Sequence, residues 1–327
     1  PNIEAISGYT PDLVIISYDP GSLVEQLSTL DIPVFVAGAA MSIENVYEQI
    51  EQLGVLTGNS QTAIEVSKTL QAGIEEAVAS GITDVLFVTG RNKETLENHF
   101  DRSPSLEQTL ADRGAFEMQS KISGLANLAA MHYVRQGVPM GLGHAVSMAK
   151  EHVGNQAFAV LLGDDLVDVS TPVLPEMYAA QAKFGGSILA LMEVPEDQIH
   201  LYGCAAVAPT DNPDIVRVTE LVEKPAAGTA PSNLAVIGRY VIDPAIFGLL
   251  ENLAPGRGGE IQLTDALMTA ASNPERAGGV LGVVFKGRRY DTGDKLDFIK
   301  ATLRLGVDRE DIGQDLRTWL KEFNKEI

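Results

Sequence analysis

The sequence is poor in cysteine, in positive charge and in long apolar runs. Its single cysteine, Cys204, can form neither an intrachain disulfide nor a cysteine cluster for zinc, which is typical of a protein from a reducing compartment. The 327 residues include 24 basic and 44 acidic ones, for a net charge of −20. Such a field repels a phosphate backbone, so we expect no nucleic-acid partner. Because no apolar run is long enough for a bilayer and no signal peptide opens the chain, we expect a cytoplasmic protein without a membrane partner.

The remaining composition is that of an ordinary globular protein of one large or two ordinary domains. Hydrophobic residues make up 45% of the chain and charged residues 21%, which is enough for a core of normal size. Strands are predicted at 84–89, 157–162, 187–192, 215–218, 235–241 and 282–285, and helices near 141–150, 174–184, 244–251, 261–271, 294–304 and 311–324. This alternation predicts an α/β fold with a mostly parallel sheet and helices on both faces. The run 157–162 carries no charge, which predicts a central and fully buried strand.

Seven short stretches carry a more specific signal. They read EEAVASGITDVLFVTGRNK (75–93), RQGVPMGLGHAV (135–146), LLGDDLV (161–167), VEKP (222–225), APSNLAVIGRYV (230–241), GGEIQLTDAL (258–267) and KGRRYDTGDK (286–295). The segment that holds them, residues 75–327, resembles the bacterial UDP-glucose pyrophosphorylase family, and the stretches follow in the family's order. One stretch alone would be weak, but seven in order are specific. The resemblance implies a Rossmann-like nucleotidyltransferase sheet.

The resemblance also implies a reaction and its partners. An oxygen of glucose 1-phosphate attacks the α-phosphorus of UTP, pyrophosphate leaves, and UDP-glucose forms. This chemistry needs in-line positioning and neutralisation of phosphate charge. Mg²⁺ commonly supplies much of that neutralisation through one or two carboxylates. A homo-oligomer is expected only by analogy with related folds.

Two aspartates are the predicted metal ligands. Asp164 follows the predicted strand 157–162, at the strand edge where α/β sheets bind ligands. Asp291 follows the strand 282–285 by a short loop. From the residues alone each could equally be a turn or capping aspartate, and the resemblance is what assigns both to Mg²⁺ and gives Asp164 a catalytic role. We expect the adjacent Asp165 to be structural.

The predicted nucleotide side lies at the start of a helix. The resemblance assigns Gln136 and Gly141 to the uracil base, since an amide can pair with its donor and acceptor edge and glycine lets the backbone approach a flat ring. On its own, a G-x-G at a helix start is usually just a tight turn. We expect His144 to be a packing or capping residue.

The predicted sugar-phosphate side lies in the VEKP stretch. The resemblance gives Glu223 the sugar hydroxyls and Lys224 the phosphate, with a catalytic role for the lysine. The plain alternative is a surface ion pair. Gly203 would leave room for the sugar, and Gly238 is a similar candidate. Arg288 and Arg289 are expected to be solvated surface cations.

Residues 1–74 differ from the rest. Strands are predicted at 13–17 and 34–37, and helices at 22–30, near 43–53 and at 60–80. These patterns resemble part of the class III periplasmic binding proteins, which bind iron-siderophores or corrinoids. In the pyrophosphorylase family a phosphate-binding loop G-x-G-T-R precedes the 75–93 stretch, and residues 1–74 do not contain it. The sequence therefore predicts a hybrid of a binding-protein-like fragment (1–74) and a nucleotidyltransferase-like domain (75–327), in which the first strand–loop unit is replaced.

Three functions follow from this hybrid: a uridylyltransferase slowed by the missing loop, a silent UDP-glucose-binding protein, or a metal-chelate or corrinoid binding module. The first two have polar residues at matched positions, whereas the third lacks a second lobe. If the N-terminal part fills the place of the missing strand, then the strand at 13–17 or, better, the run 34–38 should pair with the sheet of the larger part.

Overall fold

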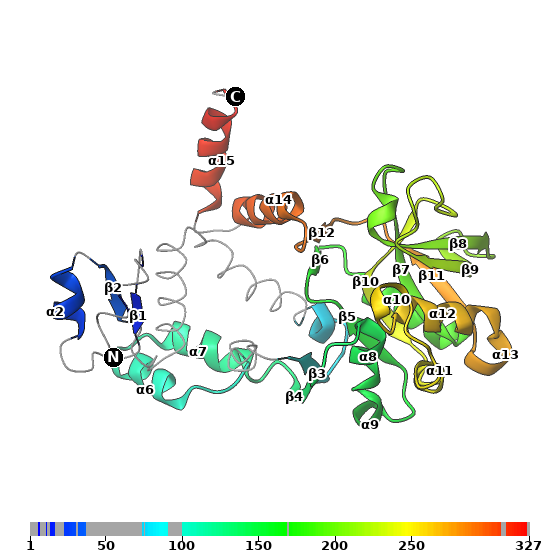
Figure 1. The fold of residues 1–327 in the computed structure, drawn as a ribbon, viewed down its shortest axis with the longest axis horizontal. Coiled ribbons are helices and arrows are strands. Elements are labelled where there is room, and N and C mark those ends of the chain that lie inside the picture. The colour runs from blue at the N-terminus through cyan, green and yellow to red at the C-terminus, as the bar shows by residue number, and fades with distance from the viewer. Residues whose placement is uncertain are drawn as a thin grey trace. The chain divides into compact units, whose positions relative to one another are not determined.

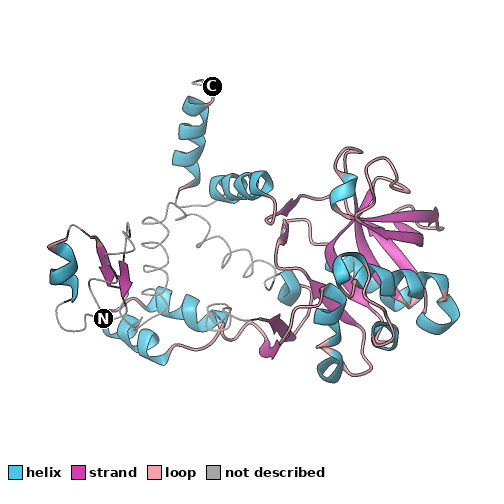
Figure 2. Cartoon of the chain, in the orientation of Figure 1, coloured by secondary structure: helices cyan, strands magenta, loops and turns pink. Residues whose placement is uncertain are grey.

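The computed structural model of the chain describes residues 6, 11, 14–16, 23–30, 32–36, 74, 76–90, 100–168, 170–308 and 312–325. The chain divides into two compact units, one of Pro1–Ser67 with Asn98–Ala126 and one of Lys68–Glu97 with Asn127–Ile327. The boundary predicted between residues 74 and 75 stays a prediction, and residues 98–126 cluster with the first unit. The fold is shown in Figure 1 and its helices and strands in Figure 2. Among the described helices, none combines the length and apolar content of a bilayer-spanning helix.

The first unit contains short elements. They are β1 (Val14–Ile16), α2 (Leu23–Ser28), β2 (Val34–Val36), α6 (Pro104–Asp112) and α7 (Phe116–Leu125). Strands β1 and β2 pair in parallel, with Val14 opposite Val34. The predicted pairing of 13–17 or 34–38 with the larger sheet joins the two units and stays a prediction. The predicted helix near 43–53 and most of that at 60–80 lie outside the described residues.

The second unit begins with two parallel strands and the helices that follow them. These are β3 (Asp84–Thr89), β4 (Ala130–Arg135), α8 (Leu142–Ser147) and α9 (Lys150–Val153). Strand β3 has the predicted bounds of 84–89. It pairs with β4 along its whole length, from Asp84 opposite Ala130 to Thr89 opposite Arg135.

A six-stranded sheet forms the centre of this unit, in the order β5-β10-β7-β11-β9-β8. Its strands are β5 (Phe158–Leu161), β7 (Ser187–Glu193), β8 (Gly203–Pro209), β9 (Ile215–Glu223), β10 (Leu234–Ile242) and β11 (Val280–Val284). Only β7 and β11 pair in parallel; the other pairings are antiparallel. The prediction of a mostly parallel sheet is therefore wrong for the described residues: β8 and β9 are joined by a short turn, which connects antiparallel neighbours, and β10 runs antiparallel to β5, β7 and β8.

Helices cover both faces of this sheet, as predicted (Figure 2). Alternate residues of β7 separate the two layers: Leu189 and Leu191 pack with α8, α11 (Ile246–Leu250) and α12 (Leu263–Ser272), and Ile188 and Ala190 pack with α10 (Leu174–Phe184). The period of two in a strand is what sends neighbouring side chains to opposite layers.

Strand β5 lies at the edge of the described sheet and its residues are half-buried. The prediction that 157–162 is central and fully buried is thus wrong for the part of the chain that the structure describes. Its lack of charge has another cause, since Phe158 and Val160 pack into one helix layer and Ala159 and Leu161 into the other. An edge strand covered on both faces needs apolar residues as much as a central one does.

The remaining elements lie outside the six-stranded sheet. They are β6 (Asp165–Val167), η1 (Ile199–Leu201), η2 (Arg257–Gly259), α13 (Pro274–Ala277), β12 (Arg289–Asp291), α14 (Lys295–Val307) and α15 (Gly313–Phe323). Strands β6 and β12 form a short antiparallel ladder that places Asp165 opposite Asp291.

Candidate active site

The β6–β12 ladder brings the two predicted metal ligands to one place. The backbone N–H and the hydroxyl of Thr292 both donate to the carbonyl of Asp164, at 2.7 and 2.8 Å, which fixes the loop before β6 against the turn after β12. A Cβ built on Gly293 would lie 3.1 Å from Asp291 Oδ1 and 3.6 Å from Asp164 Oδ2. Both carboxylates thus border the same small space, which a side chain at residue 293 would fill.

The adjacent Asp165 has a different environment. It is buried, and its two oxygens accept from Arg289 Nε at 2.7 Å and from the second guanidinium nitrogen at 2.8 Å. Its Oδ2 also accepts from the backbone N–H of Gly238 at 2.6 Å. Asp165 is a structural residue, as expected.

Arg289 is not the solvated cation that we expected. Its side chain is only 9% exposed, and it reaches Asp291 Oδ2 and the Tyr202 hydroxyl at 3.4 Å each. Burial lowers the pKa of Arg289, but the hydrogen bond and charge of Asp165 outweigh it, so the pKa lies above its usual value. The guanidinium therefore stays charged. It joins Tyr202, which precedes Gly203, to the acidic edge, the name used here for the carboxylates of Asp164 and Asp291. Its place inside the matched KGRRYDTGDK stretch was the one sequence signal for this role.

The predicted base-side loop, which contains Gln136 and Gly141 and precedes α8, packs against Glu260 and Ile261. Gly141 has a φ of 99°, and a Cβ there would lie 2.8 Å from both Glu260 Cβ and the Ile261 carbonyl. Backbone hydrogen bonds to Ile261 flank Gly141 on both sides. The N–H of Ile261 donates to the Met140 carbonyl, and the carbonyl of Ile261 accepts from the N–H of Gly143, both at 2.8 Å. Only glycine suits this conformation and approach.

Gln136 belongs to the same loop. Its Nε2 lies 3.2 Å from the carbonyl of Gly141 and 2.7 Å from His144 Nδ1. The donor end of the amide is therefore engaged within the loop, and His144 orients it, a more specific task than the packing or capping role expected.

The predicted sugar side is set by the β8–β9 ladder, in which Gly203 lies opposite Glu223. Thr264, at the start of α12, donates to Glu223 Oε2 at 2.6 Å and fixes the carboxylate beside Gly203. Sequence reasoning missed Thr264, which no pattern other than its place in the GGEIQLTDAL stretch could have revealed.

Lys224 has an unusual backbone. Its φ is +43°, the only positive value among the described residues other than glycine, and its N–H donates to the carbonyl of Tyr202 at 3.1 Å. A lysine in this region is strained, and such strain is concentrated at functional positions. The turn ends β9 and leaves Lys224 exposed.

Gly238 lies where β10 departs from regular pairing with β7. A Cβ there would lie 2.7 Å from Asp165 Cβ and 2.8 Å from Leu162 Cβ, so packing against the acidic loop already requires a glycine. Its predicted contact with substrate stays a prediction.

A second buried ion pair lies next to Gly238. Arg239 donates to Glu76 Oε2 from Nε at 3.1 Å and from a terminal nitrogen at 3.0 Å, and both side chains are 1% exposed. A third nitrogen of Arg239 donates to the Gly238 carbonyl at 3.1 Å. Among the described residues, Glu76 Oε1 has no hydrogen-bond partner. The buried negative charge of Glu76 is thus compensated by Arg239. The two residues are 163 positions apart, and no sequence pattern reveals their pairing.

The predicted site residues converge on one end of the unit. Burial raises the pKa of Tyr240, and the charges of Asp165, Glu223 and Asp164 raise it further. The short segment from Ile261 to Thr264 touches both the base-side loop and Glu223. The segment therefore links the predicted base side to the predicted sugar side, and Arg289 links Asp291 to Tyr202, which precedes Gly203.

Comparisons with known proteins indicate the family of this chain. The family model for nucleotidyl transferases matches residues 57–306. The UTP–glucose-1-phosphate uridylyltransferase of Bacillus subtilis (strain 168) is 44% identical over 259 residues, which are 79% of this chain and 87% of that protein. The solved UDP-glucose pyrophosphorylase of Acinetobacter baumannii shares 34% identity with a TM-score of 0.70, covering 78% of this chain and 88% of its own. A UDP-glucose pyrophosphorylase complexed with UDP-glucose shares 36% identity with a TM-score of 0.65, covering 74% of this chain and 87% of its own.

With a family model over most of its length and relatives this similar, the chain belongs to the UDP-glucose pyrophosphorylase family of nucleotidyl transferases.

Proposed function

We propose that the chain is a UTP–glucose-1-phosphate uridylyltransferase. A phosphate oxygen of glucose 1-phosphate forms a bond to the α-phosphorus of UTP, the bond from that phosphorus to the bridging oxygen breaks, and pyrophosphate leaves with UDP-glucose as product. The observation that carries the proposal is the meeting of Asp164 and Asp291 around Gly293, next to the sugar side that Arg289 and Tyr202 connect to it.

In this proposal the acidic edge holds Mg²⁺. Asp164 and Asp291 are two carboxylates facing one space, and Mg²⁺ is bound in this way through one or two carboxylates with water and phosphate oxygens. When bound, it would neutralise charge on the phosphates. Arg289 and the N–H of Gly293, which donates to Asp291 Oδ1 at 3.0 Å, orient the second ligand.

The other residues bind and orient the substrates. Lys224 places its ammonium on the phosphate, and Glu223, held by Thr264, accepts from the sugar hydroxyls beside Gly203. Gln136 and Gly141 contact the uracil, and Gly238 completes the floor of the sugar side. Because the loop around Gly141 is fixed by Ile261 on both sides, the base side is preorganised.

We further propose that residues 1–74 are a binding-protein-like fragment in a hybrid chain. Support comes from the absence of a G-x-G-T-R motif in the sequence and from the separate pairing of β1 with β2. Such a loop would supply several preorganised donors to the triphosphate, and losing one typically costs about 10²–10³ in rate. We therefore expect slow turnover with UDP-glucose binding retained. The similarity to uridylyltransferases does not favour a metal-chelate or corrinoid module.

Location and assembly are part of the proposal. The single cysteine, which is free and buried, supports a cytoplasmic protein. Exposed apolar side chains on α14 and α15 support a homo-oligomer: Leu296, Ile299, Leu305, Trp319 and Phe323.

The test combines pyrophosphate release from UTP, glucose 1-phosphate and Mg²⁺ with calorimetry of UDP-glucose. We expect Mg²⁺-dependent release below the usual 1–10³ per second, and its loss in Asp164→Asn but not in the matched Asp211→Asn, which alters an exposed aspartate on another loop. Neither release nor UDP-glucose binding in the intact chain would contradict the proposal.

A further inference from the structure

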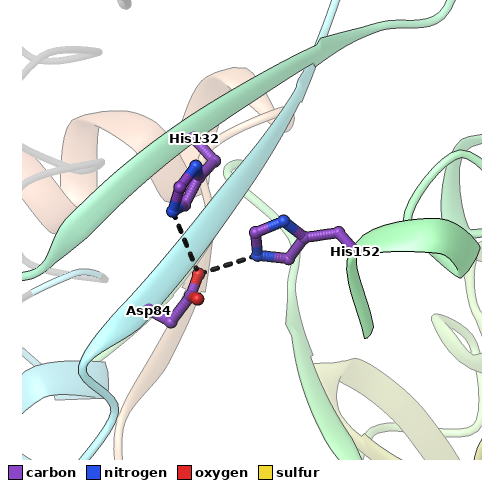
Figure 3. Close-up of side chains that lie close together, drawn as sticks. All are labelled: Asp84, His132 and His152. Carbon is purple, nitrogen blue, oxygen red and sulfur yellow. Dashed lines mark hydrogen bonds and ion pairs between the residues drawn. The ribbon is translucent and has the colours of Figure 1, made fainter. Parts of the chain in front are cut away.

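Three potential metal ligands meet outside the proposed active site. Asp84 is the first residue of β3, His132 belongs to β4, and His152 belongs to α9. Figure 3 shows both imidazoles directed at the same carboxylate. None of the three is among the residues proposed to bind substrate.

The register of the strands explains how two of them meet. Asp84 lies opposite Ala130, and His132 lies opposite Leu86, so Asp84 and His132 are diagonal neighbours on one face of the parallel pair. Long side chains reach across such a diagonal. Helix α9 adds His152 from outside the ladder. Three separate backbone segments therefore supply one side chain each.

The distances suit one cation. Asp84 Oδ1 is 2.8 Å from His152 Nε2 and 3.8 Å from His132 Nε2, and all three ligand atoms lie within 4.8 Å of one another. Zinc bonds of about 2.0–2.2 Å in tetrahedral geometry place neighbouring ligand atoms about 3.3–3.6 Å apart. The two measured separations fall on either side of that range, so small side-chain rotations would complete the geometry.

A simple surface ion pair explains the arrangement less fully. One histidine would satisfy Asp84 Oδ1, yet a second ring approaches the same oxygen, with ring centres 4.7 Å apart. Two protonated rings would repel each other at this separation. A divalent cation between two neutral imidazoles and a carboxylate uses all three groups at once.

We infer that Asp84, His132 and His152 form a binding site for a divalent transition-metal ion of the Zn²⁺ class. Two imidazoles select this class over Mg²⁺, which prefers oxygen ligands. Three protein ligands leave a fourth position to water, and the side chains are 57%, 48% and 30% exposed, so the ion can enter from solvent. The inference rests on this geometry and not on the proposed transferase activity.

The site would also have a structural consequence. His132 lies shortly before Gln136, and His152 lies in the helix after α8, so a bound ion would tie together the two ends of the segment that carries the base-side loop. Zinc should therefore stabilise this part of the chain against unfolding.

The test is calorimetric titration of the full chain with Zn²⁺, together with the visible spectrum of bound Co²⁺. We expect one ion per chain, a Kd at least tenfold weaker in His132→Ala and in His152→Ala, and no change in His200→Ala, which removes an exposed histidine outside the cluster. In EDTA the melting temperature should be the same for all four proteins, and Zn²⁺ should raise it only in the wild type and His200→Ala.

Two results would overturn the inference. One is the absence of saturable Zn²⁺ binding in the wild type. The other is binding that persists in the His132→Ala/His152→Ala double variant, and loss of that binding in Asp164→Asn would assign the ion to the acidic edge instead.

Discussion

The buried and the open charges of this unit differ in what they do. Glu76, Arg239, Asp165 and Arg289 are almost fully removed from solvent and are paired with one another through charged hydrogen bonds. Asp164 and Lys224, next to them in the chain or in space, are exposed. Buried charges are costly unless each is compensated, so the first group holds strands and loops in place, while the second group lies where a ligand in solvent can reach it. Asp164 and Asp165 are adjacent in the chain, yet Asp164 belongs to the exposed group and Asp165 to the buried one.

The largest expected effect breaks the buried group. Arg239→Ala would leave Glu76 with an uncompensated charge, because its Oε1 already has no partner among the described residues. Removing one partner of a buried pair costs about 3–5 kcal/mol. We expect a loss of that size in the free energy of unfolding by urea. The double variant Glu76→Leu/Arg239→Met should recover most of it, and a single variant within about 1 kcal/mol of the wild type would contradict the compensation.

The next prediction contrasts the two aspartates directly. Asp164→Asn should lower the rate of pyrophosphate release by about 10²–10³ and leave the melting temperature unchanged, since a preorganised electrostatic contact is lost from an exposed site. Asp165→Asn should instead lower the melting temperature, because Arg289 loses a bidentate partner. Equal effects of the two variants on stability would remove the distinction between the two groups of charges.

A smaller effect is expected where a neutral residue positions an open charge. Thr264→Val keeps the shape of the side chain but removes the 2.6 Å hydrogen bond to Glu223 Oε2. Hydrogen bonds to charged groups contribute about 1.5–3 kcal/mol, so we expect UDP-glucose to bind at least about tenfold more weakly by calorimetry. Thr264→Ser should restore the affinity. If the serine variant binds as weakly as the valine variant, the hydroxyl is not what positions Glu223.

This contrast also explains which features the sequence could predict. The apolar runs of β3, β7 and β10 and the helical patterns of α10 and α12 were placed within a few residues, because local periodicity reports burial on one side of an element. The direction of the strands was not predicted, since it depends on which distant segments pair, as β10 does with β5 and β7. Strand β4 was not predicted, and neither was the pairing of β5 with β10, because pairing between distant segments leaves no local pattern in the sequence.

Some residues of the candidate site could likewise be predicted from the sequence, whereas others could not. Its predicted ligand-binding residues lie in stretches that resemble a family, so Asp164, Asp291, Glu223 and Lys224 could be proposed from the sequence. The buried partners Arg239 and Glu76 are 163 residues apart, and their pairing follows only from the folded chain. Arg289 was expected to be a solvated surface cation, and nothing in the local sequence shows that it pairs with Asp165.

The smallest expected effect separates backbone strain from side-chain chemistry at Lys224. Both Lys224→Ala and Lys224→Gly remove the ammonium, so both should lower turnover equally if the lysine acts through its charge. They differ in the Cβ, which is strained at a φ of +43° in alanine and absent in glycine. The left-handed region costs about 1–2 kcal/mol for a residue with a Cβ, and the greater freedom of unfolded glycine offsets about 0.4–1 kcal/mol of that. We therefore expect the glycine variant to be more stable than the alanine variant by up to about 1 kcal/mol in urea unfolding. An alanine variant as stable as the glycine variant would show that the turn after β9 relaxes without cost, and that the unusual backbone of Lys224 does not help to aim its charge.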